Sequence, residues 1–587
     1  MVHSYAVNSC VFVLGLLFTL WFMGEEEHVI YSGFSTKTAY RYCSLQPFVD
    51  RASEFVDENC QLVHVNVLFR HGTRAPSGDD VVGFEELHAR LVSSTGAALP
   101  SGFEKHPIPF LNCSDRQLLP MGVHEMYTLG RTFREQSSSF FNFTPSNSRF
   151  FTSSSTRAIA SGQSFYNGLF NLSPPDPGTS YFALPSLKFK NGFGQSNDLL
   201  KVDDKLLRFF DYCDRYVKEI VHNKSTLYEY TAFKNGPEMQ HVLMDIISQH
   251  RLNESTFIRD DIYTIFLACA YEVAAYSDSD PMSPWCGFLK PAHQEVLEYL
   301  VDLKQFWRKS YGYDLNYVQS CPLVNEMVSQ VKEAAEQFKS HRFDQQDVNL
   351  HRGTFWFGHA ETVMPVVSAL GLFNDSIGAT TLQKLHADGF EIWRKKLHSK
   401  PQPPTMFRSG HIAPFAGNVA LYLYHCPDSA DSSDPYGGFR VQPRVNGQTV
   451  AWPIGSPVQP PTSQFPGSTS APLSALLRYL SDCAPEVYSD EKVCHLKTRV
   501  PAPLPTTHHH ARVHNPFPHL LCFECSGPST DLVTPNVMFP SCTRHGPKAA
   551  IYKSRLSLVI FCTRTVALQA RPFGEKLCYH QWLVIPT

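Results

Sequence analysis

The sequence predicts an α/β fold, in which a core with buried, parallel-type strands carries an inserted, mostly helical cap. Residues 61–69, QLVHVNVLF, are apolar and β-branched and lack polar alternation after Asn66, which is typical of a buried parallel strand. Residues 353–358, GTFWFG, are expected to form a second strand. Between these strands, residues 181–340 repeat apolar side chains at helical spacing, for example in HQEVLEYLVDLKQFWRKSYG.

A helix is expected directly after the second strand. The segment ETVMPVVSALGLF has Pro365 in its first turn and Gly371 near its end, and both are helix boundary signals. A strand, a polar site and a helix in this order form the usual pattern of α/β domains. The core is therefore expected at about residues 44–180 and 341–455, with the cap at about 181–340.

The composition excludes one class of partner. Hydrophobic residues make up 43% of the 587 residues and charged residues 18%, so the chain can bury a sizeable core. The formal net charge is −3 and no Lys/Arg-rich block stands out, which gives no reason to expect a nucleic-acid partner. Any anion site must therefore be local, and the oligomeric state stays open.

The N-terminus is expected to be a signal peptide over residues 1–24. Its apolar stretch, residues 10–23, is too short to span a bilayer comfortably and is followed by Gly24 and three glutamates. The segment before this stretch holds His3 but no Lys or Arg, so a signal anchor is the alternative. After cleavage, no stable insertion into a membrane is expected.

Sixteen cysteines behind an export signal indicate disulfides. Asn-x-Ser/Thr sequons also support a secretory route. The sequons at Asn142 and Asn171 are each followed by a proline and are poorer candidates. Glycosylation is expected at Asn112, Asn223, Asn253 and Asn374.

The chain changes character after about residue 455. The segment GSPVQPPTSQFPGSTSAP is typical of a linker or loop. Residues 497–587 show no sustained period and are expected to form an atypical, disordered tail beyond a domain of residues 35–496. In this tail, HHH at 508–510 and CFEC at 522–525 could indicate zinc, but disorder is the stronger expectation.

The first predicted strand ends in a cluster of positive charge, RHGTR, which holds Arg70, His71 and Arg74. In open α/β sheets, ligands bind outside the carboxyl ends of the strands. Two guanidinium groups around one imidazole can bind a tetrahedral oxyanion, and their charges favour the neutral imidazole. A neutral imidazole held against phosphorus is a nucleophile, so a phosphohistidine is expected. The similar segment TRHGPK lacks the second arginine, so its histidine, His545, is not expected to be catalytic.

Two further segments supply partners for this cluster. Arg157 follows the Ser/Thr run in FFTSSSTRAIASGQSF and is expected at a second strand end that faces the same site. In GHAET, His359 can donate to a phosphoryl oxygen and Glu361 can protonate the leaving alcohol. The helix start beside Glu361 favours the carboxylate, whereas a bound phosphate disfavours it. This His-x-Glu pair could bind a metal, but no third ligand at a recognisable spacing accompanies it, so no metal or cofactor is expected.

RHGTRAP, SSSTR and GHAE together resemble the histidine acid phosphatase family, in its phytase-like branch. GHAET, rather than the commoner His-Asp pair, is similar to the group in that branch that acts on inositol polyphosphates. The segments VDDKLLRFFDYC, AFKNGPEMQ and FRSGHIAPFAGNVALYLYHC agree, and the resemblance covers about residues 35–450. It implies a phosphoglycerate-mutase-like α/β core, the histidine phosphatase fold, with a helical cap.

The resemblance also implies a function, the hydrolysis of phosphomonoesters in inositol polyphosphates, including inositol hexakisphosphate. It makes His71 the nucleophile and Glu361 the proton donor. It places around the phosphoryl group Arg70, Arg74, Arg157 and His359. A substrate with several phosphates needs more cations, and Lys205 and Arg208, at i and i+3, can share a helix face for that purpose. An exposed pair on an amphipathic helix is the alternative.

Resemblance and proximity together suggest four disulfides: Cys60–Cys426, Cys213–Cys321, Cys269–Cys286 and Cys483–Cys494. Cys10 should be lost with the signal segment. A family member ends in an endoplasmic-reticulum retention tetrapeptide, whereas this chain ends in LVIPT. Either the lumen of the endoplasmic reticulum or secretion is therefore expected.

Two other functions stay open. An acid phosphatase for a phosphoglycerate or a sugar phosphate would use the same His71 chemistry, because the arginines read only the phosphoryl group. A secreted, non-catalytic protein that binds phosphate ligands would form no phosphohistidine.

Overall fold

The computed structural model describes residues 33–43, 59–173, 199–276, 282–340, 350–374, 389–403, 406–427, 433–454, 469–496, 557–558 and 585–586. Contacts divide the chain into two units, Met1–Val500 and Pro501–Thr587. In the second unit, strand β9 (Ser557–Leu558) pairs antiparallel with β10 (Ile585–Pro586). The expected signal peptide, residues 455–468 of the linker and the rest of the expected tail, with its HHH and CFEC motifs, lie outside the described residues, whereas the end of the linker, residues 469–472, is described.

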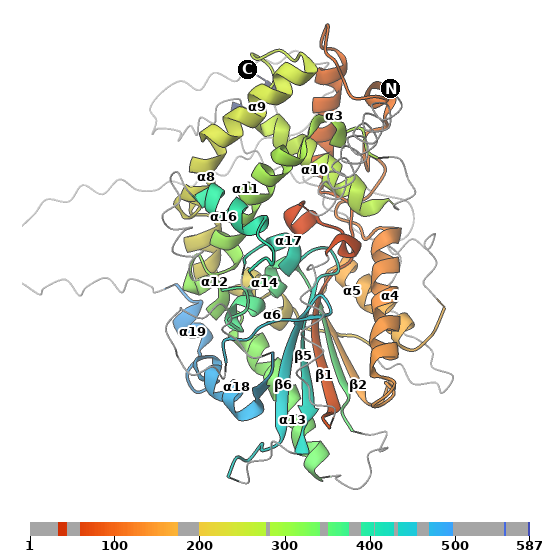
Figure 1. The fold of residues 1–587 in the computed structure, drawn as a ribbon, viewed down its shortest axis with the longest axis vertical. Coiled ribbons are helices and arrows are strands. Elements are labelled where there is room, and N and C mark those ends of the chain that lie inside the picture. Colours follow the sequence, from red (N-terminus) through yellow and green to blue (C-terminus); the bar gives the residue numbers. More distant parts are fainter. Residues whose placement is uncertain are drawn as a thin grey trace, which may run out of the picture. The chain divides into compact units, whose positions relative to one another are not determined.

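A mixed sheet of eight strands forms the core of the first unit (Figure 1). Its order is β3-β2-β4-β1-β5-β6-β7, and β8 pairs with β6. Strand β4 lies between β2 and β1 and is parallel to both, whereas β5 is antiparallel to β1. The strands are β1 (Gln61–Arg70), β2 (Ser148–Thr152), β3 (Lys201–Val202), β4 (Gly353–Gly358), β5 (Asn418–His425), β6 (Phe439–Val445), β7 (Gln448–Thr449) and β8 (Ala471–Pro472).

Helices cover both faces of this sheet (Figure 1). Helices α4 (Pro120–Ser137) and α5 (Thr156–Leu169) pack against each other on one face. Helices α13 (Cys321–Ser340) and α14 (Ala360–Ala369) contribute to the apolar core on the other face. The first unit is therefore a layered α/β structure, as the strand and helix patterns predict.

Strand β1 shows why the layers form. It is buried along nearly its whole length, which the absence of polar alternation predicts. Successive side chains point to opposite faces, so Leu68 belongs to the core with α13 and α14. Phe69 instead lies 4.8 Å from Phe165 on α5 and 5.7 Å from Phe133 on α4, measured between ring centroids.

A second apolar core lies in the helical region in the upper part of Figure 1. It joins helices α3 (Gly78–Val92), α9 (Pro237–His250), α10 (Arg259–Ala275), α11 (Pro291–Lys309) and α16 (Gly389–Leu397). Helices α3 and α16 come from outside residues 181–340, whereas α13 lies inside that range and packs on the sheet. Packing therefore divides the helices differently from a split at residues 181 and 340.

Shorter helices connect these elements. The N-terminal described segment forms η2 (Ser35–Lys37), which packs against α17 (Ser409–Ile412), α10 and α11. The others are η3 (Tyr40–Tyr42), η4 (Phe103–Lys105), α6 (Asp204–Leu207), α7 (Phe209–Tyr212), η6 (Tyr216–Val221), η7 (Lys224–Leu227), α8 (Tyr228–Lys234), η8 (Cys286–Phe288), α12 (Asp314–Val318), α18 (Leu473–Tyr479), η10 (Ser481–Cys483) and α19 (Asp490–Val493).

The structure pairs eight cysteines in four disulfides: Cys60–Cys426, Cys213–Cys494, Cys269–Cys286 and Cys321–Cys483. The second and fourth pairs correct the expected Cys213–Cys321 and Cys483–Cys494. The reason is the docking of the segment from α18 to α19. This segment places Cys483 beside the start of α13 and Cys494 beside η6, where Arg215 N donates to Cys494 O at 2.9 Å. Proximity in the sequence therefore gave the wrong partners.

The four asparagines expected to carry glycans, Asn112, Asn223, Asn253 and Asn374, are all exposed. A glycan at any of them would meet solvent rather than the core. No helix among the described residues is both long and apolar enough to cross a membrane.

Candidate active site

The carboxyl ends of three parallel strands meet at one edge of the sheet. Arg70, the last residue of β1, is in register with Gly358, the last residue of β4, and β2 ends beside β4 at the same edge. The next residues along the chain are His71, Ser153 and His359. The rings of the two histidines lie 5.7 Å apart, measured between centroids. The topology thus brings together residues that are far apart in the sequence.

The loop after β1 is packed tightly against the start of α4. A Cβ atom on Gly72 would lie 2.4 Å from the carbonyl oxygen of Gly122, so this approach requires glycine. Thr73 donates its backbone N–H and its hydroxyl to the two carboxylate oxygens of Glu125, at 2.8 and 3.0 Å. These contacts hold the loop that carries His71 in one position.

His71 is held in the tautomer that a nucleophile needs. Its Nδ1 lies 2.9 Å from the carbonyl oxygen of Gly72, and a carbonyl only accepts, so Nδ1 carries the proton. Burial, followed by the charges of Arg70 and Arg157, lowers the pKa of His71 well below its ordinary value. The neutral ring therefore keeps a lone pair on Nε2.

Three arginines, Arg70, Arg74 and Arg157, form what we call the arginine cluster. Arg70 Nη1 donates to the carbonyl oxygens of Thr36 and Ala413 at 2.5 and 2.8 Å. In all three arginines the Nε–H is buried, and no described atom accepts it. Buried donors without an acceptor are costly, so three of them at one site favour the binding of an anion there.

The arginine cluster is also electrostatically strained. Burial, followed by the charge of Arg74, lowers the pKa of Arg70 to about 9 and that of Arg157 to about 10. These guanidinium groups repel one another in surroundings that solvate them poorly. A bound anion would relieve both effects at once.

His359 connects the arginine cluster to β2. Arg157 Nη2 donates to its Nδ1 at 3.3 Å, so Nε2 carries the proton and donates to Ser153 Oγ at 3.0 Å. Burial, with Arg157 next, lowers the pKa of His359 to about 3, so the ring is neutral. Donation to a phosphoryl oxygen, the role expected for His359, requires the Nε2–H to leave Ser153.

Glu361 lies in the first turn of α14, two residues after His359. Its Oε1 accepts a hydrogen bond at 2.8 Å from Nζ of Lys309, which is the last residue of α11. Burial opposes ionisation, but Lys309 outweighs it and holds the pKa of Glu361 well below its ordinary value. The side chain is 40% exposed, so a substrate can reach it. In the free protein, Glu361 is a carboxylate.

The two expected cations for additional phosphates do not share one helix face. Helix α6 ends at Leu207, so Arg208 lies at the break before α7. Its Nε donates to Asp211 at 2.8 Å, and Lys205 is exposed. Arg208 nevertheless lies near the site, because its charge adds to the effect of burial on the pKa of His359. Their role in substrate binding stays a prediction.

No local pattern of residues indicated the two lysines at the site, Lys37 and Lys309. Lys37 ends η2, and Lys309 ends a helix whose pattern predicts only an amphipathic surface. Ser153 was likewise part of a Ser/Thr run without a distinct role. No cluster of three or more His, Cys, Asp or Glu side chains that could hold a metal occurs among the described residues.

The fold and the site define a histidine phosphatase: the chain belongs to the histidine phosphatase superfamily, branch 2, whose family model matches residues 61–443. This match runs from the first residue of β1 into β6. Both the resemblance inferred from the motifs and the predicted α/β core with helical regions are confirmed.

Individual relatives and solved structures carry narrower names than the family. The chain is 31% identical over 438 residues to multiple inositol polyphosphate phosphatase 1 of Homo sapiens, which covers 70% of this chain and 81% of that protein. It is 31% identical over 391 residues to the protein of that name in Gallus gallus, covering 66% and 76%. A crystal structure of Bifidobacterium longum multiple inositol polyphosphate phosphatase in complex with inositol hexasulfate has a TM-score of 0.53 at 14% identity and covers 79% of this chain and 100% of that one.

Proposed function

We propose that this chain hydrolyses phosphomonoesters of inositol polyphosphates, including inositol hexakisphosphate, through a phosphohistidine at His71. The human and chicken relatives are named for this substrate class. The Bifidobacterium longum structure is titled as a complex with inositol hexasulfate, whose sulfate groups resemble phosphates in shape and charge. Together with the site geometry, these relatives support the proposal.

The main support for the proposal is that the site combines one nucleophilic nitrogen, on His71, with three buried N–H donors that no described atom accepts. His71 holds its proton on Nδ1 and offers a lone pair on Nε2. The arginine cluster has three buried Nε–H groups that no described atom accepts. A tetrahedral phosphate satisfies such donors and is attacked by such a nitrogen.

In the first step, the lone pair of His71 Nε2 attacks phosphorus and the bond from phosphorus to the inositol oxygen breaks. The electron pair stays on that oxygen, which takes a proton from the Glu361 carboxyl group. Glu361 is ionised in the free protein, and the negative charge of an arriving phosphate raises its pKa so that it can carry this proton. The arginine cluster offsets the charge on the phosphoryl oxygens.

In the second step, water attacks the phosphohistidine and the phosphorus–nitrogen bond breaks. The Glu361 carboxylate, left by the first step, takes a proton from the water. The electron pair returns to Nε2 of His71, and inorganic phosphate leaves. The histidine and the carboxyl group are then as they were before the first step.

The test is to incubate the purified protein with inositol hexakisphosphate between acidic and neutral pH and to follow released phosphate. We expect release by the wild type, none by His71→Ala, and an acid-labile, base-stable phosphoprotein after quenching. Release from a phosphoglycerate or sugar phosphate alone would assign a different phosphomonoester. If neither released phosphate nor a labelled phosphoprotein is detected, the chain is a non-catalytic binding protein and the proposal is overturned.

We also propose that the chain works in the secretory pathway, either in the lumen of the endoplasmic reticulum or after secretion. Four disulfides fit an oxidising compartment, and the four asparagines expected to carry glycans are exposed. A shift of the expressed protein on a gel after treatment with an N-glycosidase is expected. A protein without glycans and with reduced cysteines would contradict this location.

A further inference from the structure

Two lysines lie beside the arginine cluster although one reacting phosphate does not need them. Lys37 is partly buried, and its Nζ lies 5.6 Å from the centroid of the Tyr271 ring. The guanidinium group of Arg74 lies 5.8 Å from the same centroid, so one ring of α10 borders both cations. No hydrogen bond or ion pair joins Lys37 Nζ to another described residue, whereas Lys309 Nζ contacts Glu361 at 2.8 Å.

The charges around Lys37 are those of the site. Burial lowers its pKa well below the ordinary value, and Arg74, Arg70 and Lys309 lower it further. Glu361 acts in the opposite sense. Four charged side chains of the site therefore act on Lys37, and three of them are positive. Only Glu361 is negative. An ammonium group in such surroundings lacks an anion.

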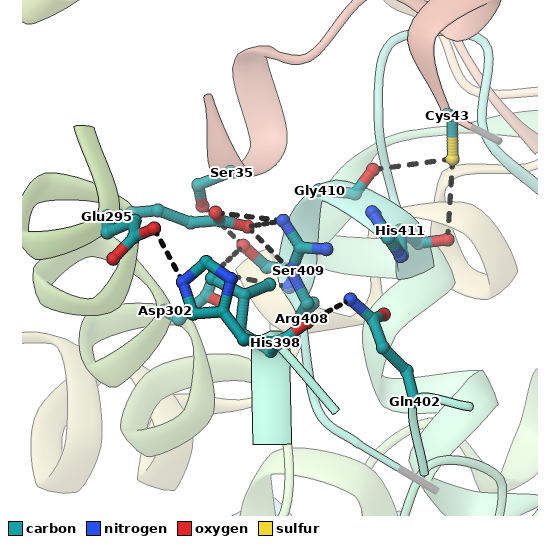
Figure 2. Close-up of polar contacts among 12 residues, drawn as sticks. Ser35, Cys43, Glu295, Asp302, His398, Gln402, Arg408, Ser409, Gly410 and His411 are labelled. Carbon is teal, nitrogen blue, oxygen red and sulfur yellow. Dashed lines mark hydrogen bonds and ion pairs between the residues drawn. The ribbon is translucent and has the colours of Figure 1, made fainter. Parts of the chain in front are cut away.

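The position of Lys37 is built into the fold. In the turn η2, Ser35 and Ser409 share a hydrogen bond between their hydroxyl groups, and Ser409 Oγ donates to Asp302 Oδ1 at 2.5 Å (Figure 2). Between Ser35 and Lys37, the carbonyl oxygen of Thr36 accepts from Arg70 Nη1 at 2.5 Å. The turn that carries Lys37 is thus fixed both to α11 and α17 and to the arginine cluster itself.

A buried ion pair strengthens this anchor. Arg408, next to Ser409, donates to Glu298 of α11 through Nε and Nη2, at 2.7 to 2.9 Å. Both side chains are buried, so the junction of η2, α11 and α17 is held by charge-assisted hydrogen bonds. Ordering a lysine side chain has a large entropic cost in general, and anchoring its backbone removes part of that cost before a ligand binds.

We propose that Lys37 and Lys309 form a second phosphate subsite, which holds a non-reacting phosphate of the substrate beside the phosphate bound by the arginine cluster. This inference rests on the proposed function, because only a substrate with several phosphates can occupy both subsites. It makes Lys37 a specificity-determining residue. A substrate with one phosphate gains little from Lys37, whereas a ring with neighbouring phosphates gains a charge-assisted contact.

The two lysines differ as targets for a test. Lys309 also contacts Glu361, so its removal changes the proposed proton donor as well as the subsite. Lys37 forms no hydrogen bond or ion pair with Glu361 or another described residue, and only its charge acts on Glu361, so it is the cleaner choice. A matched control is Lys339, which lies over a tyrosine ring too, 5.9 Å from the centroid of Tyr436. Lys339 lies in the last turn of α13 next to Phe338, which contacts His425 opposite the start of β1, at the far end of β1 from Arg70.

The experiment compares the full chain with Lys37→Met, Lys37→Arg and Lys339→Met. The measured quantities are kcat/KM for inositol hexakisphosphate and for p-nitrophenyl phosphate, and inhibition of the latter reaction by inositol hexakissulfate. For Lys37→Met we expect kcat/KM on the hexakisphosphate to fall by roughly ten- to a hundredfold, the range of one charge-assisted hydrogen bond, and the inhibition constant of the sulfate to rise similarly. The loss on p-nitrophenyl phosphate should stay within about threefold. Lys37→Arg should recover most of the loss, and Lys339→Met should match the wild type.

Equal losses on both substrates, or an unchanged inhibition constant for the hexakissulfate in Lys37→Met, would overturn the subsite while leaving the proposed function intact. If the wild type hydrolyses p-nitrophenyl phosphate but not inositol hexakisphosphate, the proposed function fails. The inhibition constants then still test the subsite, because their measurement does not require turnover of the polyphosphate. An unaltered melting temperature of Lys37→Met shows that the variant is folded.

Discussion

At the scale of single residues, His71 and Glu361 divide the proposed chemistry between them. Glu361→Gln removes the proton source but leaves the arginine cluster, so the loss should depend on the leaving group. General acid catalysis contributes roughly 10²- to 10⁴-fold, and an inositol alkoxide should show this full loss in kcat. With p-nitrophenolate, which needs little protonation, most of the loss should vanish. Equal losses in kcat on the two substrates would show that Glu361 is not the acid.

Lys309 controls the proton affinity of Glu361 in the free protein. Against burial, Lys309 holds the pKa of this carboxyl low, and His359, the N-cap residue of α14, adds to its effect. Arg70 of β1, Arg157 of α5 and Lys37 of η2 also interact with Glu361. Lys309→Met should therefore raise the pKa of Glu361.

An acid acts only while it is protonated, so the pH profile of kcat/KM should respond in a defined direction. In Lys309→Met its alkaline limb should move to higher pH, because Glu361 keeps its proton longer. Glycerol 2-phosphate suits the measurement, since it has one phosphate and a poor leaving group. Lys339→Met is the control and should keep the profile of the wild type. A limb that stays in place or moves to lower pH would contradict the role of Lys309.

At the scale of elements, the approach of the loop after β1 to α4 can be tested with one methyl group. In Gly72→Ala the new Cβ would lie 2.4 Å from Gly122 O, so the loop must move and carry His71 with it. Displacement of a nucleophile by about 1 Å costs on the order of 10²-fold in rate, which is the loss expected in kcat. Gly78→Ala is the matched control, because nothing lies within 4 Å of its Cβ. A Gly72→Ala enzyme as active as Gly78→Ala would contradict the tight packing.

Strands β1 and β4 were predictable because each is an apolar run followed by an unusual polar motif. Strand β1 is one residue longer than the predicted range 61–69, and β4 has the predicted bounds 353–358. Helix α13 was harder to place, since an amphipathic pattern shows that a helix buries one face but not which partner covers it. Its apolar face packs mainly on β1 and α14, and α6, a helix within residues 181–340, also contacts it.

Lys37 and Lys309 show where prediction from the sequence stops. Their neighbours in the chain form no motif. The two lysines reach the site only through the fold, which places the ends of η2 and α11 near one edge of the sheet. Arg70 and His71 were found because five fixed residues stand together. A contact between distant segments leaves no such trace in one sequence.

At the scale of the whole molecule, two disulfides attach the segment from α18 to α19 to the rest of the first unit. They join Cys321 to Cys483 and Cys213 to Cys494. Replacing both members of either pair with serine should lower the free energy of unfolding by about 2–4 kcal/mol, measured with denaturant under non-reducing conditions. Cys113→Ser, at a free and partly exposed cysteine, is the control and should not change it.

Peptide mapping without reduction provides a second measurement of the same feature. It should recover one peptide pair joining Cys213 to Cys494 and another joining Cys321 to Cys483. Recovery of Cys213 joined to Cys321 would restore the pairing suggested by the sequence. It would also show that the segment after α18 does not dock as described.

This connectivity has a consequence for the synthesis of the chain. Cys213 precedes its partner by 281 residues and Cys321 precedes its partner by 162. At roughly 5–20 residues per second, both thiols wait on the order of ten seconds to a minute before their partners have been made. In an oxidising compartment they can meanwhile pair with each other, and only thiol–disulfide exchange then releases them. The yield of native protein should therefore depend on how fast a disulfide isomerase corrects this early pair.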